Sequence, residues 1–258
     1  MTIQVFDRRA SKLLYERTVS RPFENPKAPS ASGPRRRLTL SVARTECDRL
    51  AAESLLNRRY EWRGYGSHHK IGGSAYQTTF LARMGPSLAG TITLGVDTPE
   101  GLAADALFKA EIDEYRRVRG SRVCELTRFA FEKCDRKDNN SLLACLFHAV
   151  FLYGSDSYEG TDLFIEVNPR HRRFYEAMLG FKPIGELRMN GTVDAPSQLM
   201  WISVSEIASQ IQRFRSGKST CKHSLYSYFL SEAEEVRVKS RLALQGERGA
   251  LSTLFEAC

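Results

Sequence analysis

The segment CELTRFAF, residues 124–131, places a carboxylate and a guanidinium inside a run of residues that favours a β-strand. A charged residue in the middle of such a run is unusual, because buried strands are built almost entirely from apolar side chains. Glu125 is therefore a candidate proton acceptor, since a positioned carboxylate can serve as a general base. Two other interpretations stay open: Glu125 can lie at an exposed strand position, or it can form a buried ion pair with Arg128.

Strand geometry sets a condition on this pair. Side chains alternate between the two faces of a strand, so Glu125 and Arg128 point to opposite faces of a regular strand. An extra residue in the strand, a β-bulge, would bring both side chains to one face. Joint action of the two residues therefore requires a bulge.

A second group of functional side chains follows the first expected helix, in LLNRRYEWRGYG, residues 55–66. Arg59 and Arg63 are suited to hold a carboxylate, because a guanidinium can make two parallel hydrogen bonds to it. Tyr60 and Trp62 can line a pocket or anchor the loop. The alternative for the arginines is a solvated helix end.

The sequence lacks the signatures of several large enzyme classes. It contains no G-x-x-x-x-G-K-[ST] or G-x-G-x-x-G loop, no G-x-S-x-G turn and no H-E-x-x-H motif. His68 and His69 are adjacent, so their rings project differently and make a poor chelate. The six cysteines form no C-x-x-C pair, and we expect neither a metal site nor a disulfide framework. The chemistry must then come from acid–base groups and from shape.

Composition and charge limit the class of protein, its location and its partners. The chain has 258 residues, 42% hydrophobic and 26% charged, which is typical of soluble globular proteins. No stretch approaches the roughly 20 apolar residues of a membrane helix, and the first residues lack the apolar core of a secretory signal. The expected location is the cytoplasm. The net charge of +8 fits either a solvated basic surface or the attraction of an acidic partner.

The order of the expected elements predicts a mixed α/β domain. A strand at 122–132, an apolar helix at 141–153 and a strand at 162–167 imply a parallel crossover within a mostly antiparallel sheet. The other expected elements are helices at 46–60, 105–118, 169–179, 206–215 and 232–244, and strands at 76–84, 88–97, 181–185 and 198–204. The predicted organisation is an N-terminal arm at 1–40, an α/β domain at 41–204 and a helical C-terminal extension at 205–258.

Four blocks of sequence, in order, resemble a known group of enzymes. They are LLNRRYEWRGYG, GTITLGVDTPEGLAADALFKAEID, CELTRFAF and IEVNPRHRRFYEAMLGF, and they cover roughly residues 48–185. The third resembles the E-[IVL]-[ST]-R-[FL]-A block of acyl-homoserine-lactone synthases, and the last resembles the closing segment of GNAT-type acyltransferases. Together the blocks look like the N-acyl amino acid synthases of the GNAT superfamily, of which the long-chain N-acyltyrosine synthases are examples.

The resemblance implies a GNAT-like fold and an acyltransferase that moves a fatty acyl group from acyl carrier protein to the α-amine of an amino acid. GNAT enzymes usually hold the pyrophosphate of coenzyme A in a glycine-rich loop, whereas DRKDNNSLLACLF has no glycine. The single phosphate of a phosphopantetheine arm would meet Arg136 and Lys137 instead. No bound cofactor is expected, and an acidic carrier protein would suit the basic net charge.

The resemblance also implies roles for individual residues. Glu125 would accept the proton of the amine, Tyr175 would protonate the leaving thiolate, and a bulge near Arg128–Phe131 would offer a backbone N–H to the oxyanion. Arg59 and Arg128 are favoured for the carboxylate of the amino acid, although Tyr175 could simply pack its helix on the sheet. The substrate-binding candidates are Arg59, Tyr60, Trp62, Arg63, Phe129, Phe131, Asn168 and His171.

Three other functions stay open. An acyltransferase of the same fold could use acyl-CoA as the donor. An acyl-homoserine-lactone synthase would also close a lactone from S-adenosylmethionine. A non-catalytic protein of this fold would only bind a ligand, and nucleic acid is an expected partner in that last case alone.

Overall fold

The computed structural model describes residues 38–132, 136–218 and 224–240, with the backbone alone at 136–138. In this part of the chain, seven strands form one sheet in the order β1-β2-β3-β4-β5-β7-β6. Neighbouring strands are antiparallel except for β4 and β5, which are parallel, as the crossover predicted. The strands are β1 (Leu38–Val42), β2 (Gln77–Met84), β3 (Ser87–Val96), β4 (Val123–Phe131), β5 (Asp162–Val167), β6 (Lys182–Asn190) and β7 (Ala195–Ser203).

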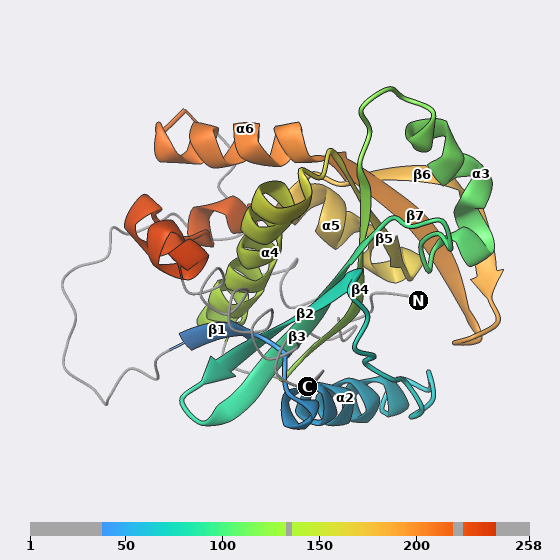
Figure 1. Ribbon diagram of the computed structural model, residues 1–258, viewed down its shortest axis with the longest axis horizontal. Helices are drawn as coiled ribbons and strands as arrows, with labels where there is room; N and C mark the ends of the chain where they lie inside the picture. The colour runs from blue at the N-terminus through green and yellow to red at the C-terminus, as the bar shows by residue number, and fades with distance from the viewer. Residues whose placement is uncertain (1–37, 133–135, 219–223, 241–258) are drawn as a thin grey trace, which may run out of the picture.

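Helices cover both faces of the sheet (Figure 1). One face, here called the α4 side, packs against α4, α5 and α6, and the other, the α2–α3 side, packs against α2 and α3. The α-helices are α2 (Glu46–Glu61), α3 (Asp105–Arg116), α4 (Arg136–Tyr158), α5 (Arg172–Leu179) and α6 (Val204–Arg215), and the 3-10 helices are η1 (Pro169–His171) and η2 (Leu225–Tyr228). None of the helices described is both long and apolar enough to cross a membrane. The predicted mixed sheet flanked by helices is confirmed.

The crossover from β4 to β5 is built from the most apolar part of the chain. Residues 142–150 of α4 are all buried, because this helix is apolar nearly all round and packs against β1, β2 and β3. The helix is longer than the expected 141–153 and runs from Arg136 to Tyr158. The less apolar turns at its two ends carry no strong periodic signal, which explains why the sequence placed its limits too far inward.

Local signals define the turn that follows β5. The side chain of Asn168 caps η1 by accepting a hydrogen bond from the backbone N–H of Arg170 (3.2 Å). Pro169 occupies the first helical position, where its missing N–H costs nothing. Gly180 ends α5 with φ of +82°, a left-handed conformation that glycine adopts without strain. These caps fix where α5 begins and ends beside the sheet, as predicted.

Two parts of the sheet differ from the prediction. Leu38–Val42 pairs with β2 as an edge strand, although residues 38–40 were assigned to the N-terminal arm; residues 1–37 lie outside the described chain. The closing strands are also longer than expected, since β6 runs to Asn190 and β7 starts at Ala195. Pairing along the β6–β7 hairpin stabilises polar segments that have little strand propensity of their own.

The C-terminal extension begins with α6 and is held on α4 through a buried histidine. His148 of α4 accepts a hydrogen bond at Nδ1 from the backbone N–H of Leu230 (2.9 Å), and its Nε2 lies 2.7 Å from the carboxylate of Glu235. The ring also stacks on Phe229 at a centroid distance of 4.5 Å. Burial lowers the pKa of His148 to about 4, so the ring is neutral at pH 7. A helix at 232–240 follows.

This arrangement predicts acid sensitivity. Because the pKa of His148 is lower in the folded chain than in the unfolded chain, the unfolded chain binds more protons, and stability is lost as pH falls from 6.5 towards 4. We expect His148 to account for about 2 kcal/mol of lost unfolding free energy between pH 6.5 and 5. In urea unfolding over this pH range, the free energy of unfolding of His148→Gln should depend less on pH than that of the unaltered protein. The exposed His68→Gln is the control, and an equal flattening there would contradict the assignment.

Candidate active site

The sheet opens between its two parallel strands. Pairing of β4 with β5 runs from Val123–Asp162 to Leu126–Ile165 and stops there. Both strands continue, β4 to Phe131 and β5 to Val167, without pairing to each other. The carboxyl ends of adjacent parallel strands are where open α/β sheets commonly bind ligands. Residues from Thr127 on β4 and from Glu166 on β5 therefore line the opening.

A bulge interrupts β4 at this point. Thr93 pairs with Thr127 and Thr91 with Ala130, so Arg128 and Phe129 together oppose one residue of β3. Arg128 has φ of +50°, in the left-handed region that bulges of this geometry usually fill with glycine. Such a conformation costs a non-glycine residue about 1–3 kcal/mol and tends to occur at functional sites. The predicted bulge near Arg128 is confirmed.

The bulge brings Arg128 to the same face as Glu125. Before the bulge Leu126 packs on the α4 side, and after it Phe129 packs there as well, while Ala130 packs against α2. Glu125 and Arg128 both lie on the α2–α3 side as a result. The condition that the sequence set for joint action of the two residues is met.

Glu125 is buried and points towards the start of α3. Its carboxylate accepts hydrogen bonds from the backbone N–H groups of Ala103 (2.8 Å to Oε1) and Ala104 (3.0 Å to Oε2). Burial raises the pKa of Glu125, and these two N–H groups and the nearby Arg128 oppose the rise. A raised pKa suits a general base, because the group then holds a proton more readily near neutral pH. The exposed strand position is excluded. Within the described part of the chain, main-chain N–H groups anchor the carboxylate, and it forms no direct ion pair with Arg128.

The guanidinium of Arg128 is fixed by two other segments. Its Nε donates to the backbone oxygen of Lys70, and its Nη1 donates to Oε1 of Gln77, each at 2.9 Å. Burial lowers the pKa of Arg128, and nearby ionisable groups oppose this effect. Those groups are Glu125, Tyr60 and Glu53. Arg128 therefore joins β4, β2 and the loop after α2 on one side of the opening.

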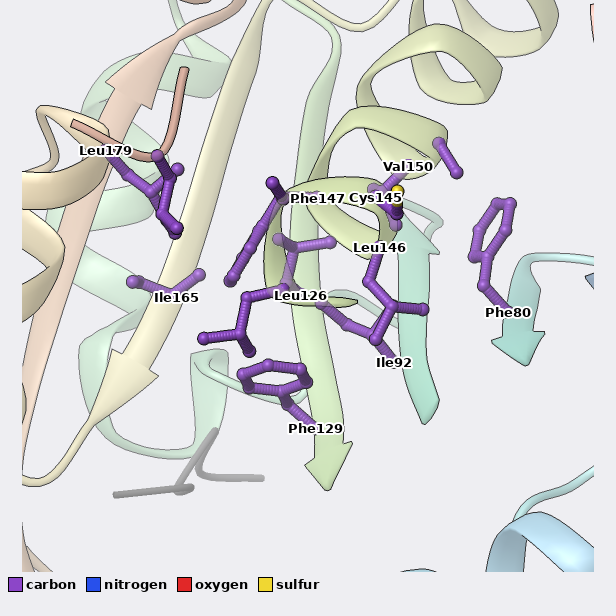
Figure 2. Close-up of a cluster of buried hydrophobic side chains, with 14 of the residues drawn as sticks. Phe80, Ile92, Leu126, Phe129, Cys145, Leu146, Phe147, Val150, Ile165 and Leu179 are labelled. Carbon is purple, nitrogen blue, oxygen red and sulfur yellow. The ribbon is translucent and has the colours of Figure 1, made fainter. Parts of the chain in front are cut away.

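Aromatic side chains fill the α4 side of the opening. Phe129 lies 5.4 Å from Phe147 of α4, and Phe147 lies 6.4 Å from Tyr175 of α5, measured between ring centroids. Figure 2 shows Phe147 reaching from α4 towards Leu126 and Phe129. Phe131 belongs to the same buried cluster. The two faces of the opening thus differ sharply: one is aromatic and aliphatic, and the other carries charged groups.

Tyr175 is the polar exception on the aromatic side. Its side chain is fully buried, and its hydroxyl has no hydrogen-bond partner among the described residues. Burial, followed by the nearby Tyr60, raises the pKa of Tyr175, so the phenol keeps its proton at neutral pH. Burying a hydroxyl without a hydrogen-bond partner costs folding free energy, which is why a functional role for Tyr175 is considered.

The candidate substrate-binding residues at the end of α2 and in the loop after it differ in burial. Tyr60 is buried and meets His69 edge-to-face at 4.7 Å. Trp62 is 57% exposed, and the guanidinium carbons of Arg59 and Arg63 lie 5.4 and 4.8 Å from its ring centroid. Tyr60 is therefore an interior residue, whereas Trp62 lies at the surface with Arg59 and Arg63 beside its ring.

The residues that follow β5 include an uncharged histidine and a neighbouring arginine. His171 is buried, and burial together with Arg170 and Arg63 lowers its pKa to about 3, so the ring is uncharged at pH 7. Nε of Arg170 lies 3.1 Å from Nε2 of His171, and Arg170 also donates to the hydroxyl of Tyr65. Asn168 has the capping role described above. The side chains of Arg136 and Lys137, assigned to the donor phosphate, lie outside the described part of the chain.

Sequence reasoning missed one charged residue at the opening. Glu166 of β5 is buried, and its Oε1 accepts hydrogen bonds from Nδ2 of Asn190 (2.6 Å) and Oγ of Ser197 (2.5 Å). The signal was present in DLFIEV, because a single carboxylate in an apolar strand is as unusual there as Glu125 is in β4.

The fold and the site together define a class. A mostly antiparallel sheet whose one parallel pair separates beside a bulge, with helices on both faces, is that of a GNAT-type acyltransferase. The family model described as "N-acyl amino acid synthase FeeM" matches residues 51–203. The chain belongs to this family and is an N-acyltransferase. No curated protein matches it.

The chain is also similar to several solved structures. FeeM, an N-acyl amino acid synthase from uncultured soil microbes, is 28% identical over 69% of this chain and 98% of its own, with a TM-score of 0.59. The acyl-homoserine-lactone synthase LasI is 14% identical over 65% of this chain and 90% of its own (TM-score 0.47). A spermidine N-acetyltransferase from Vibrio cholerae, in complex with CoA and spermine, is 15% identical over 66% and 98% (TM-score 0.46).

Proposed function

We propose that this N-acyltransferase joins a fatty acyl group, delivered by acyl carrier protein, to the α-amine of an amino acid. The observation that carries the proposal is the two-sided opening between β4 and β5. An apolar acyl chain suits the aromatic α4 side, and a charged amino acid suits the α2–α3 side, where Glu125 and Arg128 lie. The acyltransferase domain is proposed to span residues 41–204, with residues 205–258 as a helical extension.

The proposed chemistry uses one proton acceptor and one proton donor. The amine nitrogen attacks the thioester carbonyl carbon, a C–N bond forms, and the C–S bond then breaks. Glu125 accepts the amine proton, directly or through a water molecule, and Tyr175 gives its proton to the leaving thiolate sulfur. A backbone N–H at the bulge stabilises the oxygen as it becomes anionic. Arg128 holds the carboxylate of the amino acid.

The remaining assigned residues bind the substrates in this proposal. Phe129 and Phe131 contact the acyl chain, since both lie in the apolar cluster of the α4 side. Tyr60 and His171 are both buried and contact the acceptor in this proposal. Trp62, Arg59, Arg63 and Asn168 form its rim, and Arg136 and Lys137 meet the phosphate of the donor.

Carrier protein is favoured over coenzyme A by charge and by sequence. The net charge of +8 would attract an acidic carrier, and electrostatic attraction raises the rate of encounter between proteins. Residues 135–147, which include the first turns of α4, contain none of the glycines that usually surround a pyrophosphate. A phosphopantetheine arm, with one phosphate, places a smaller demand on that segment.

Donor preference gives a direct test. With the same acyl chain and amino acid, kcat/KM is expected to be at least about tenfold higher for acyl carrier protein than for acyl-CoA at low salt, because steering by charge acts on the carrier. This advantage should shrink as salt screens the charges. Initial rates of thiol release at several ionic strengths measure both effects.

A pair of charge reversals localises the carrier. Arg173 is exposed at the start of α5, beside the carboxyl end of β5, whereas Arg119 is exposed before the amino end of β4. Arg173→Glu should weaken the reaction with carrier protein more than Arg119→Glu, and neither should change the reaction with acyl-CoA. Equal or better use of acyl-CoA by the unaltered protein would overturn the carrier as donor.

Two other results would indicate a different function. A lactone product would indicate the homoserine-lactone reaction, and salt-sensitive DNA binding without thioester cleavage would indicate a binding protein.

A further inference from the structure

The guanidinium of Arg116 joins the end of β3 to the start of α3. It donates two hydrogen bonds to the carboxylate of Asp97 (both 2.7 Å) and two to that of Asp105 (2.8 and 2.7 Å). Its fifth N–H donates to Asp113 at 2.7 Å. All five N–H groups of this side chain therefore donate to carboxylates. Such two-point contacts fix the direction of a guanidinium as well as its distance, which a single point charge does not.

These contacts fix both ends of the loop at 98–104, which connects β3 to α3. Asp97 directly follows β3, and Asp105 is the first residue of α3. Oδ2 of Asp105 also accepts the N–H of Leu102 (2.6 Å) inside the loop. Gly101 has φ of +83°, and a Cβ there would lie 2.3 Å from Oδ2 of Asp105. The loop is thus closed tightly around a carboxylate that the guanidinium holds.

The loop presents two main-chain donors to Glu125. The N–H groups of Ala103 and Ala104 donate to the two oxygens of its carboxylate (2.8 and 3.0 Å). They directly precede α3, at the end where the helix dipole also favours a negative charge. On β3, Gly95 pairs with Glu125, and a Cβ there would lie 3.3 Å from Cγ of Glu125, so the strand leaves room for the carboxylate. The ionised form of Glu125 is therefore favoured by donors whose position the loop sets.

Other charged side chains lie on the α2–α3 side of the sheet with Glu125. They are Arg128 on β4, Glu166 on β5, Arg188 on β6, and Asp97, Asp105, Lys109, Glu111, Asp113 and Arg116 at the end of β3 and on α3. The carboxylates of Asp97, Asp105 and Asp113 meet at one guanidinium, so they would repel one another without it. Loss of that guanidinium is therefore expected to loosen the loop and to withdraw its two donors from Glu125.

We propose that Arg116 is a positioning residue for the proposed base: it holds the loop at 98–104 so that the N–H groups of Ala103 and Ala104 stay on the carboxylate of Glu125. The inference rests on the proposed function, in which this carboxylate accepts the amine proton. Arg116 contacts no reacting atom in this account. It acts on the proton affinity of Glu125, because losing the two N–H bonds makes the ionised carboxylate less favourable.

Replacing Arg116 by glutamine is expected to move the acid limb of kcat/KM to higher pH by about one unit, the effect of losing roughly one hydrogen bond to a charged group. At a given pH on this limb, kcat/KM then falls about tenfold. At high pH, where Glu125 is ionised in both proteins, kcat should change little. Arg116→Lys keeps the positive charge without the two-point contacts, so it should give a smaller shift in the same direction. Initial rates over a wide pH range measure these effects.

Arg188 supplies the matched control, because it ties the same helix to β6. It pairs with Glu111 of α3 and donates to the backbone oxygen of Leu107, rather than to the loop at 98–104. Arg188→Gln should lower stability in urea unfolding, as Arg116→Gln does, while leaving the acid limb in place. An unchanged acid limb in Arg116→Gln, or the same shift in both variants, would overturn the role of Arg116.

Titration of Glu125 in the substrate-free protein separates this test from activity. With glutamate isotopically labelled at its side-chain carboxyl carbon, the NMR signal of Glu125 is the one missing from Glu125→Gln. The pKa of this signal should be higher in Arg116→Gln and Arg116→Lys than in the unaltered protein, and unchanged in Arg188→Gln. Arg116→Lys keeps the measurement valid if Arg116→Gln does not fold. Absence of any N-acyl amino acid product would mean that the proposed function fails, whereas an equal pKa in all these proteins would remove the positioning role alone.

Discussion

Replacing Glu125 by glutamine is expected to lower kcat for amide synthesis by about 10²- to 10⁴-fold, the usual contribution of a general base. The carboxylate is buried, two residues before the opening begins on β4 and on the same face as Arg128, and burial raises its pKa. The base must be ionised to act, so kcat/KM of the unaltered enzyme should rise with pH through this raised pKa. That acid limb should disappear in Glu125→Gln. Carrier binding should not change, because Glu125 contacts neither the phosphate nor the protein surface in this account.

Glu125 also anchors the loop before α3, and this role needs its own control. Glutamine would turn an N–H towards Ala103 or Ala104, which costs about 1–3 kcal/mol. Asp105 holds the same loop, since its Oδ2 accepts the N–H of Leu102 (2.6 Å) and pairs with Arg116. Asp105→Asn should therefore lower stability with little change in kcat. Equal losses of kcat in the two variants, in proportion to their losses of stability, would make Glu125 a loop anchor and not a base.

For Tyr175→Phe, activity and stability are expected to move in opposite directions. Loss of the proton donor to the thiolate should reduce kcat by about 10²- to 10⁴-fold. The protein should meanwhile be as stable as before or more stable by about 1 kcal/mol, because the lost hydroxyl is buried without a partner among the described residues. Steady-state rates and urea unfolding on the same preparations measure the two effects.

A second tyrosine gives the opposite pattern and so serves as the control. Tyr226 of η2 is buried, and its hydroxyl donates to the backbone oxygen of Leu179 at 2.9 Å. Tyr226→Phe should lose about 1 kcal/mol of stability and keep kcat, because this hydroxyl ties the C-terminal segment to α5. Full activity in Tyr175→Phe would mean that Tyr175 only packs α5 on the sheet, the alternative left open by the sequence.

The sequence predicted most of the fold because its strongest signals are local. Thr45 caps α2 by accepting the N–H of Asp48 (3.1 Å), and Gly180 ends α5; both are residue types that favour these positions. The apolar character of α4 and β5 predicted the parallel crossover. The edge strand at Leu38–Val42 was missed, since its five residues owe their conformation to pairing with β2 and carry a weak signal of their own.

The site was predictable in part. A charged residue inside a strand pointed to Glu125, and strand alternation showed that its partnership with Arg128 needed a bulge. The partners that anchor Glu125 were not predictable, because Ala103 and Ala104 are more than 20 residues away in sequence and contribute only main-chain N–H groups. Glu166 carried the same signal as Glu125, and its place just beyond the last β4–β5 pair becomes visible only in the structure.

The most direct test is mass spectrometry of lipid extracts from cells that overproduce the protein, compared with cells that overproduce Glu125→Gln at the same level. The account predicts a species whose mass equals a fatty acid plus an amino acid minus one water, present with the unaltered protein and strongly reduced with the variant. An acyl-homoserine lactone in its place, or equal amounts of the amide from both proteins, would contradict it.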